Sequence, residues 1–340
     1  MSYQRIGTPK VYVDYANYAL TLGKIDSTDF TFTSSGSGSA VSLSTGSNLM
    51  GMFDMKPSNL QQINSNTSER TLFITIDTHL STDSQVDNNF VAILGHNLAE
   101  AGAKFQIEQS DNFGSNVYDV GNQTAVVNSA VSSGFHVPAN NGWSLVTFTD
   151  RTGSDDNRNW RIRIEPSSTI YSANIQIGAI LLGEVISFPN SPDLQLTRSF
   201  VFDGVTKQTS IGGQTYANAK FLSGADWFLD PFNIDATRTT PNPIKKTGRQ
   251  TWDMKFSYLT DTDVFPETLY SVDGLVQGND FYTNLIHRTH GGMLPFLFQY
   301  DETLTDARDS FLWCRLNNEP QFQQVANRVW STNINLIEEF

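Results

Sequence analysis

The sequence has few residues of the kinds that crosslink a chain or hold it in a membrane. Its single cysteine, Cys314 in FLWCRL, allows neither an intramolecular disulfide nor a thiolate metal cluster, so we expect a buried structural thiol. The apolar run IQIGAILLGEVI is shorter than the ~20 residues of a membrane span and includes Glu184. No cationic segment followed by an apolar one opens the chain, so we expect no secretory signal.

Positive charge is also scarce. The 340 residues include 22 Lys plus Arg against 35 Asp plus Glu, a formal net charge of −13. Such a surface repels phosphate backbones and anionic lipids, so we expect no nucleic-acid partner and no membrane insertion. Abundant Ser, Thr and Asn, with 24 Gly and 12% aromatic residues, favour short strands joined by polar turns over long helices.

Apolar and polar residues alternate along much of the chain, which predicts half-buried antiparallel strands. The clearest runs are TLFITID, NWRIRIEP, ANIQIGAILLGEV, TWDMKFSYLT and VWSTNINLIEEF. One segment, DGLVQGNDFYTNLIHRTHGG, predicts a helix that Asp280 caps and that ends at Gly291 and Gly292. A second, shorter helix is predicted at TLYSVD, residues 268–273.

A proline-rich join divides the chain into two halves of domain size. Pro189 and Pro192 lie between two series of strands, and proline marks strand ends because it lacks the backbone donor. The sequence therefore predicts a mainly β protein made of two antiparallel β-sandwich domains, residues 1–190 and 191–340, with one α-helix in the second.

The histidines lack the spacing of a metal site. His287 and His290 could share a helix face and bind a metal, but no carboxylate lies in that turn, which favours an interaction with the helix dipole. In NNFVAILGHNL, His96 follows a strand as many catalytic histidines do. Gly95 and Asn97, however, make its surroundings good turn chemistry. We predict that the His96 ring bonds nearby backbone and fixes this turn, so that His96→Ala costs stability and leaves binding unchanged.

Carboxylates gather in two polar segments without forming a recognisable site. These are DSQVDNN, with Asp83 and Asp87, and DRTGSDDNRNW, with Asp150, Asp155 and Asp156. Calcium binding is one interpretation, but neither segment matches a spaced calcium loop, so we expect solvated turns. No nucleophile elbow or phosphate loop is present. We therefore expect no catalytic residue, cofactor or metal, although acid pairs from distant strands remain the basis of an alternative, a polysaccharide-cleaving enzyme.

Three aromatic residues beside turns are candidate contacts for a glycan or a partner protein: Trp143 in NNGWSLV, and Trp227 and Phe228 in ADWFLDPF, where Phe232 follows. The favoured alternative is that these rings fill the open end of a sandwich.

Four segments of the second half, taken in order, resemble the ring-forming domain of bacteriophage distal tail proteins. They are LTRSFVFDG, RQTWDMKFSYLTDTDV, FYTNLIHRTHGGMLPFLFQYD and DSFLWCRLNNEPQFQQVANRVWSTNINLIEEF. The resemblance implies a structural protein of the virion tail tip or baseplate, folded in the host cytoplasm. It would form a homo-oligomeric ring, a hexamer, that contacts other tail proteins and links the tail tube to the adsorption machinery.

The first half resembles the discoidin-like or galactose-binding-like jelly rolls of marine phage virion proteins. The resemblance rests on MFDMKPSNL, NNFVAILGHNL, NWRIRIEP and IQIGAILLGE. It implies an adaptor or a host-surface glycan binder. The alternatives are a carbohydrate-binding module acting at the phage tip or elsewhere, and a capsid decoration or tail-fibre protein. Repeats and heptads are absent, which argues against a long fibre.

Overall fold

The computed structural model describes residues 7–79, 88–110, 113, 118–119, 121–149, 158–194, 196–201, 205–219, 249–265, 270–272, 275–277, 281–303 and 310–339. The described part of the protein is mainly β, with large antiparallel sheets and few helices, which confirms the predicted fold class. Within the described residues, no helix is long and apolar enough to cross a membrane.

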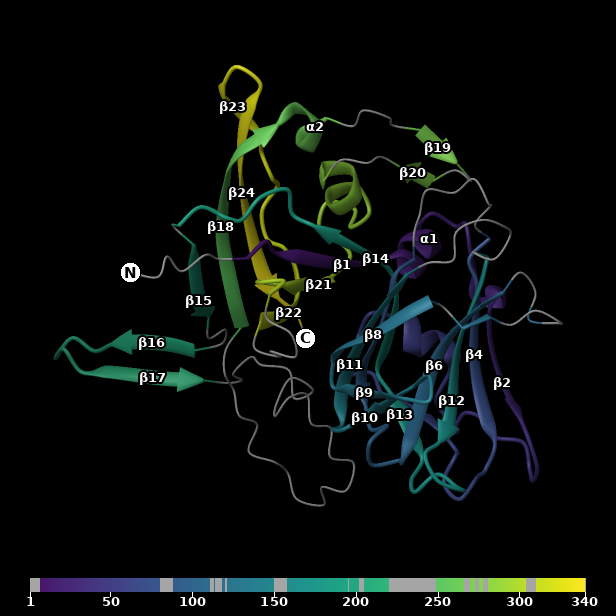
Figure 1. The fold of residues 1–340 in the computed structure, drawn as a ribbon. Coiled ribbons are helices and arrows are strands. Elements are labelled where there is room, and N and C mark those ends of the chain that lie inside the picture. Colours follow the sequence, from purple (N-terminus) through teal and green to yellow (C-terminus); the bar gives the residue numbers. More distant parts are fainter. Residues whose placement is uncertain are drawn as a thin grey trace, which may run out of the picture.

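An eleven-stranded antiparallel sheet runs through both halves of the described chain (Figure 1). In spatial order its strands are β15 (Thr197–Val201), β18 (Arg249–Thr260), β24 (Val329–Glu338), β22 (Phe311–Leu316), β21 (Phe296–Gln299), β1 (Lys10–Asp14), β14 (Ala179–Ser187), β5 (Phe90–His96), β11 (Gly142–Thr149) and β8 (Gly121–Val127), with β23 (Gln323–Ala326) paired to β24. Val11 of β1 lies opposite Ile186 of β14 on one side and Phe298 of β21 on the other. The first strand therefore belongs to both halves.

A second, seven-stranded sheet lies in the first half. It contains β2 (Phe30–Ser35), β4 (Thr71–Asp77), β12 (Asn159–Pro166), β6 (Ala103–Ser110), β10 (Phe135–Pro138) and β9 (Ser129–Ser132), with β7 (Tyr118–Asp119) paired to β6. The two-stranded sheets are β3 (Gln61–Ile63) with β13 (Ile175–Ile177), β16 (Val205–Thr209) with β17 (Thr215–Ala219), and β19 (Tyr270–Val272) with β20 (Leu275–Gln277). The helical segments are α1 (Tyr15–Thr21), α2 (Asp261–Val264), the 3₁₀ turns η1 (Ser27–Asp29) and η2 (Leu49–Phe53), and the π-helical turn η5 (Tyr282–His287).

The core of the first half is a sandwich. The apolar residues of TLFITID and NWRIRIEP point inward from the seven-stranded sheet, as their alternation predicts. They pack against the inward residues of β5, β11 and β14 in one buried cluster. Because one face of β4 and β12 is used in this way, the polar residues between them face outward.

A second buried cluster lies on the second half of the large sheet. Phe188, just after β14, stacks on Phe256 of β18 with ring centroids 4.8 Å apart, and Phe281 contacts it at 4.6 Å. Leu285 of η5 is fully buried in the same cluster. In the first half of the chain, a second layer of strands covers the large sheet. In the second half, the turn η5 covers it instead.

A third buried cluster shows that the large sheet curls. Trp143 of β11 and Phe311 of β22 contact each other edge to face with ring centroids 5.2 Å apart. These strands are five positions apart in the sheet, about 24 Å if it were flat at ~4.8 Å per strand. The sheet must therefore bend round on this face and enclose the side chains of both halves.

The long predicted helix is confirmed at its centre and wrong at its start, whereas the shorter predicted helix is wrong where it is described. Residues 275–277, expected in the long helix, form β20, and Val272 of β19 lies opposite Leu275. The shorter helix at 268–273 is likewise strand β19 where it is described. Only the segment from Phe281 through η5 is helical, and Asp280 lies outside the described residues. Pairing of the two short apolar segments thus outweighs their helical spacing.

Helix α1 was not predicted, although Asp14 provides its start signal. The carboxylate accepts from the Asn17 backbone N–H at 3.1 Å and from the Asn17 side chain at 2.6 Å. Its other oxygen accepts from the Leu182 backbone N–H of β14 at 3.0 Å. Burial raises the pKa of Asp14 to about 6 against these hydrogen bonds, which lower it. Asp14 therefore ties the end of β1 to β14 as well as starting the helix.

The two halves are also joined by side chains outside β1. Arg288, after η5, forms an ion pair with Glu184 of β14, and the Arg288 side chain is 5% exposed. His290 Nε2 lies 2.6 Å from Thr21 Oγ1, and its ring packs on Tyr18 of α1. The division at residue 190 remains a prediction, and these contacts cross it.

The close approach of β1 to β14 at Gly183 predicts a strong substitution effect. A Cβ at Gly183 would lie 1.9 Å from the Val13 carbonyl oxygen, which is backbone. We expect Gly183→Ala to lower the free energy of unfolding by about 3 kcal/mol, measured by denaturant titration. Gly212→Ala is the matched control, because the nearest atom to its Cβ would be 3.9 Å away. Equal stability of the two variants would contradict the shared position of β1.

Candidate functional site

Trp143, one of the three aromatic residues predicted to contact a glycan or partner, is fully buried. Burial excludes Trp143 as a surface contact and agrees with the favoured alternative that the ring fills the interior, where it packs on Phe311. Its polar neighbours Asn140 and Asn141 suggested an exposed loop, yet Trp143 already belongs to β11. Trp227 and Phe228, with Phe232, lie outside the described residues.

His96 ends β5 and holds a turn. The Leu98 backbone N–H donates to its Nδ1 at 3.3 Å, so the ring proton resides on Nε2, which lies 2.9 Å from Ser144 Oγ. Burial lowers the pKa of His96 to about 3, so the ring is neutral near pH 7. Gly95 before it has φ 66, and a Cβ there would meet the Pro57 carbonyl oxygen at 2.3 Å. The prediction that His96 bonds nearby backbone is confirmed.

The other predicted ligand groups do not come together in the described residues. His287 is exposed, whereas His290 turns away toward Thr21 of α1. Both carboxylate segments considered for calcium, residues 83–87 and 150–156, lie outside the described residues.

A different polar surface, the outer face of the seven-stranded sheet, carries charged side chains that pack against aromatic rings. Register places the outward residues of β4, β12 and β6 side by side, because all three strands pair in antiparallel register. We call the charged and aromatic residues of this surface the outer-face ladder: Phe73, Lys104, Glu108, Phe113, Phe135, Arg161, Arg163 and Glu165.

Arg161 occupies the middle of the outer-face ladder. Its guanidinium carbon lies 4.4 Å from the Phe73 ring centroid and 4.3 Å from that of Phe113. Its Nε and Nη2 donate to Glu108 Oε2 at 2.6 and 2.5 Å. The Glu108 side chain is 2% exposed, so this carboxylate is held almost without water. Stacking and charge-assisted hydrogen bonds together fix the arginine in one orientation.

The ladder continues along β12 toward Phe135. Arg163 bonds Glu165, with its Nε donating at 2.8 Å, and reaches Glu108 at 3.3 Å. Lys104 forms an ion pair with Glu165 at 3.4 Å and lies 4.3 Å from the half-buried Phe135 ring. Each charged group thus has an opposite charge beside it, and shared carboxylates join the groups into one network that packs against the phenyl rings.

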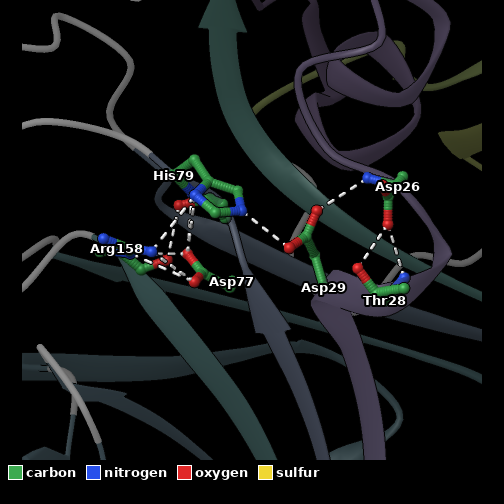
Figure 2. Close-up of polar contacts among 7 residues, drawn as sticks. Asp26, Thr28, Asp29, Asp77, His79 and Arg158 are labelled. Atoms are coloured by element: carbon green, nitrogen blue, oxygen red, sulfur yellow. Dashed lines mark hydrogen bonds and ion pairs between the residues drawn. The ribbon is translucent and has the colours of Figure 1, made fainter.

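A second polar group lies at the end of β4. We call it the His79 cluster, and it consists of Asp26, Thr28, Asp29, Asp77, His79 and Arg158 (Figure 2). His79 Nε2 lies 2.7 Å from Asp29 Oδ1, at the start of β2. Arg158 donates to both oxygens of Asp77, at 2.9 and 2.8 Å, and lies 3.2 Å from His79 Nδ1. Asp26 accepts from the Thr28 backbone N–H and its hydroxyl. Three chain segments meet here.

The His79 cluster is arranged for binding polar groups. One oxygen of Asp29, one of Asp77 and one ring nitrogen of His79 lie within 4.8 Å of one another, a set that could ligate a metal. Arg158, however, already occupies both oxygens of Asp77. Partial burial would raise the pKa of Asp77, but hydrogen bonds from Arg158 and the His79 backbone, with both charges, hold it below its ordinary value. Asp77 is therefore ionised and unsuited to act as a general acid.

Sequence reasoning could have found part of this surface. The alternation in NWRIRIEP places Arg161 and Arg163 on the face opposite the core. Nothing local connects His79 to Asp29 or Arg158, because they lie 50 and 79 residues apart in sequence. The aromatic partners of the arginines come from other strands and turns, so their spacing carried no signal.

Comparison with known proteins finds similarity only at the level of solved structures. No protein-family model matches the chain. No curated protein matches it in sequence. Among solved structures, a CBM32 module from a Clostridium perfringens family 31 glycoside hydrolase covers 45% of this chain and 94% of its own, at 10% identity and TM-score 0.30.

Two further structures are similar over the same share of this chain. Chitosan-binding module 1 from a chitosanase/glucanase of Paenibacillus sp. IK-5 covers 46% of this chain and 96% of its own, at 18% identity and TM-score 0.31. A pectin-binding carbohydrate-binding module covers 45% and 89%, at 15% identity and TM-score 0.29. At these identities and TM-scores the likeness carries no argument about what this chain binds.

The buried neutral His96 predicts a pH-dependent cost of substitution. Its pKa is about 3 in the folded chain and ~6.5 when unfolded, so its contribution is complete above pH ~6.5 and is lost as pH falls toward 3. We expect His96→Ala to cost about 2–4 kcal/mol at pH 7 and about 2 kcal/mol less at pH 5. Chemical denaturation at both pH values measures this. The control Ser144→Ala should cost less, with little pH dependence, and an unchanged His96→Ala cost at pH 5 would contradict the assignment.

Proposed function

We propose that the chain is a non-catalytic carbohydrate-binding protein and that the outer-face ladder is its binding surface. The observation that carries this proposal is the combination of half-buried phenyl rings with ion-paired arginine and carboxylate side chains on one face of a sheet. This face is turned away from the core that the seven-stranded sheet shares with β5, β11 and β14.

The rings and the charged pairs match the two kinds of surface on a sugar. A pyranose has an apolar face of C–H groups, which packs on a phenyl ring. Arg161 already lies over Phe73, and Lys104 and Arg163 lie over Phe135, so a sugar would stack on the ring surface that these cations leave exposed. Its hydroxyl groups both donate and accept hydrogen bonds. Arg163 offers donors beside the acceptor oxygens of Glu165, so a hydroxyl finds both partners at one place.

The preorganisation of these side chains favours affinity. Rotamer freedom lost on binding costs about 0.5–1.5 kcal/mol for each flexible side chain that a ligand immobilises. Arg161 has already lost that freedom, because two rings and Glu108 fix it. A glycan bound here therefore meets a surface that needs little ordering.

Substitution of Phe135 is the direct test of this function. We expect the full chain to be retarded in affinity electrophoresis through soluble polysaccharides, and Phe135→Ser to lose about tenfold or more in affinity for the retarding glycan, because one stacking face is removed. The melting temperature should fall only slightly, since the half-buried ring lies on the outer face and outside the buried core clusters.

Tyr258→Ser serves as the matched control, because Tyr258 is an aromatic residue of β18, 79% exposed and on the other half of the chain. It should bind as the unaltered protein does. Absence of retardation across a broad glycan panel, or equal binding by Phe135→Ser, would overturn the proposed function.

A second function, assembly as a subunit of a phage tail tip, is favoured by a separate observation. β15 is the last strand of the large sheet, all five of its residues are exposed, and Phe200 is 50% exposed. The neighbouring hairpin of β16 and β17 extends away from the body of the protein (Figure 1). Ile211 at its turn is fully exposed and Tyr216 is 59% exposed. Open strand edges with exposed apolar residues are suited to pairing with a neighbouring subunit.

Charge introduced at this edge tests assembly independently of glycan binding. We expect the full chain to form a ring-sized oligomer by light scattering, and Phe200→Glu combined with Ile211→Asp to reduce it to monomer, because a buried unpaired carboxylate opposes the contact. Val131→Asp is the control, since Val131 is 52% exposed on β9. A monomeric unaltered protein, or an oligomeric double variant, would contradict this second function.

A further inference from the structure

We infer that the glycan bound by the outer-face ladder is neutral, a chain of uncharged hexoses without carboxylate, sulfate or free amino groups. This inference rests on the proposed carbohydrate-binding function and goes further by naming the ligand class. The reason is that the charged side chains of this face already form ion pairs with one another.

The three cations of the ladder share its two carboxylates, and each cation already has at least one of them as a partner. Arg161 is committed to Glu108, and Arg163 to Glu165 with a further contact to Glu108. Lys104 is committed to Glu165. An acidic sugar would have to compete with these internal carboxylates for each guanidinium, and the internal partners are covalently fixed in place.

Hydroxyl groups do not face this competition. A hydroxyl accepts from an arginine N–H and donates to the neighbouring carboxylate, so it can lie against an intact pair. A ligand carboxylate or sulfate only accepts, and it would repel Glu165 and Glu108 at short range. The paired arrangement therefore selects groups that donate and accept together.

The His79 cluster at the end of the face does not favour acidic ligands either. In the His79 cluster, Arg158 is bound to both oxygens of Asp77, and Asp29 and Asp26 add negative charge. The whole chain has a formal net charge of −13, which repels polyanions at long range. Cationic amino sugars are disfavoured on the ladder itself, because Lys104, Arg161 and Arg163 already occupy both of its carboxylates.

The test compares glycans that differ in charge. The full chain is run in affinity electrophoresis against neutral glucans and galactans, a polyuronate, a sulfated galactan and chitosan, at low and at high salt. We expect retardation by a neutral polysaccharide that is the same at both salt concentrations, because no net charge is neutralised on binding. We expect no retardation by the charged polymers.

A single substitution that releases a cation sharpens the test. Glu165→Gln removes the partner of Lys104 and one partner of Arg163. It should add a salt-sensitive, few-fold gain in affinity for the polyuronate and weaken binding of the neutral glycan, because Glu165 also accepts from the sugar hydroxyl. Glu319→Gln changes the net charge equally at an exposed site on the other half of the chain and should gain nothing.

Three outcomes separate this inference from the function beneath it. Binding of the neutral glycan with a polyuronate gain only in Glu165→Gln establishes the inference. Preferential binding of a charged polymer by the unaltered protein overturns the inference and leaves carbohydrate binding intact. A folded protein that binds no member of the panel overturns both.

Discussion

The pairing of β1 with two partners is the constraint on which the rest of the structure depends. Lys10 to Asp14 pair with β14 on one side, and Lys10 to Tyr12 pair with β21 on the other. Alternate residues of this strand then enter different clusters, with Val11 and Val13 in one and Tyr12 in another. Asp14 closes the arrangement by capping α1 and bonding β14. Five residues thus hold both halves of the chain in one sheet.

That constraint determines which surfaces remain for function. The curl of the large sheet buries aromatic residues such as Trp143, and the sandwich core takes the inner face of the seven-stranded sheet. The outer face of β4, β12 and β6 is left to polar and aromatic residues, and they satisfy one another: Glu108 is nearly inaccessible because two arginines cover it. A buried carboxylate is tolerated when it is paired and hydrogen-bonded, and the same pairing makes the surface rigid enough to recognise a ligand. The free edge at β15 lies on the opposite half, so glycan binding and assembly would use separate surfaces.

Local sequence patterns predicted the structure correctly where every second residue of a strand is buried. The alternation of Trp160, Ile162 and Ile164 predicted both the strand and its inner face, and Gly95 with His96 predicted a turn held by a ring. Prediction failed where distant segments decide the outcome. Trp143 is buried only because the sheet curls toward Phe311, 168 residues later in the chain, and Leu275 is in a strand because β19 pairs with it. The His79 cluster has no local signal, because loops from three segments build it.

In the proposed function, the glycan lies on the outer face of the seven-stranded sheet. A crystal structure of the full chain bound to an oligosaccharide of the retarding polysaccharide measures this directly. We expect a sugar ring stacked on Phe135, with a hydroxyl within hydrogen-bonding distance of both Arg163 and Glu165. A glycan bound at the loops of either end, or on the second half of the chain, with the outer-face ladder unoccupied, would contradict it.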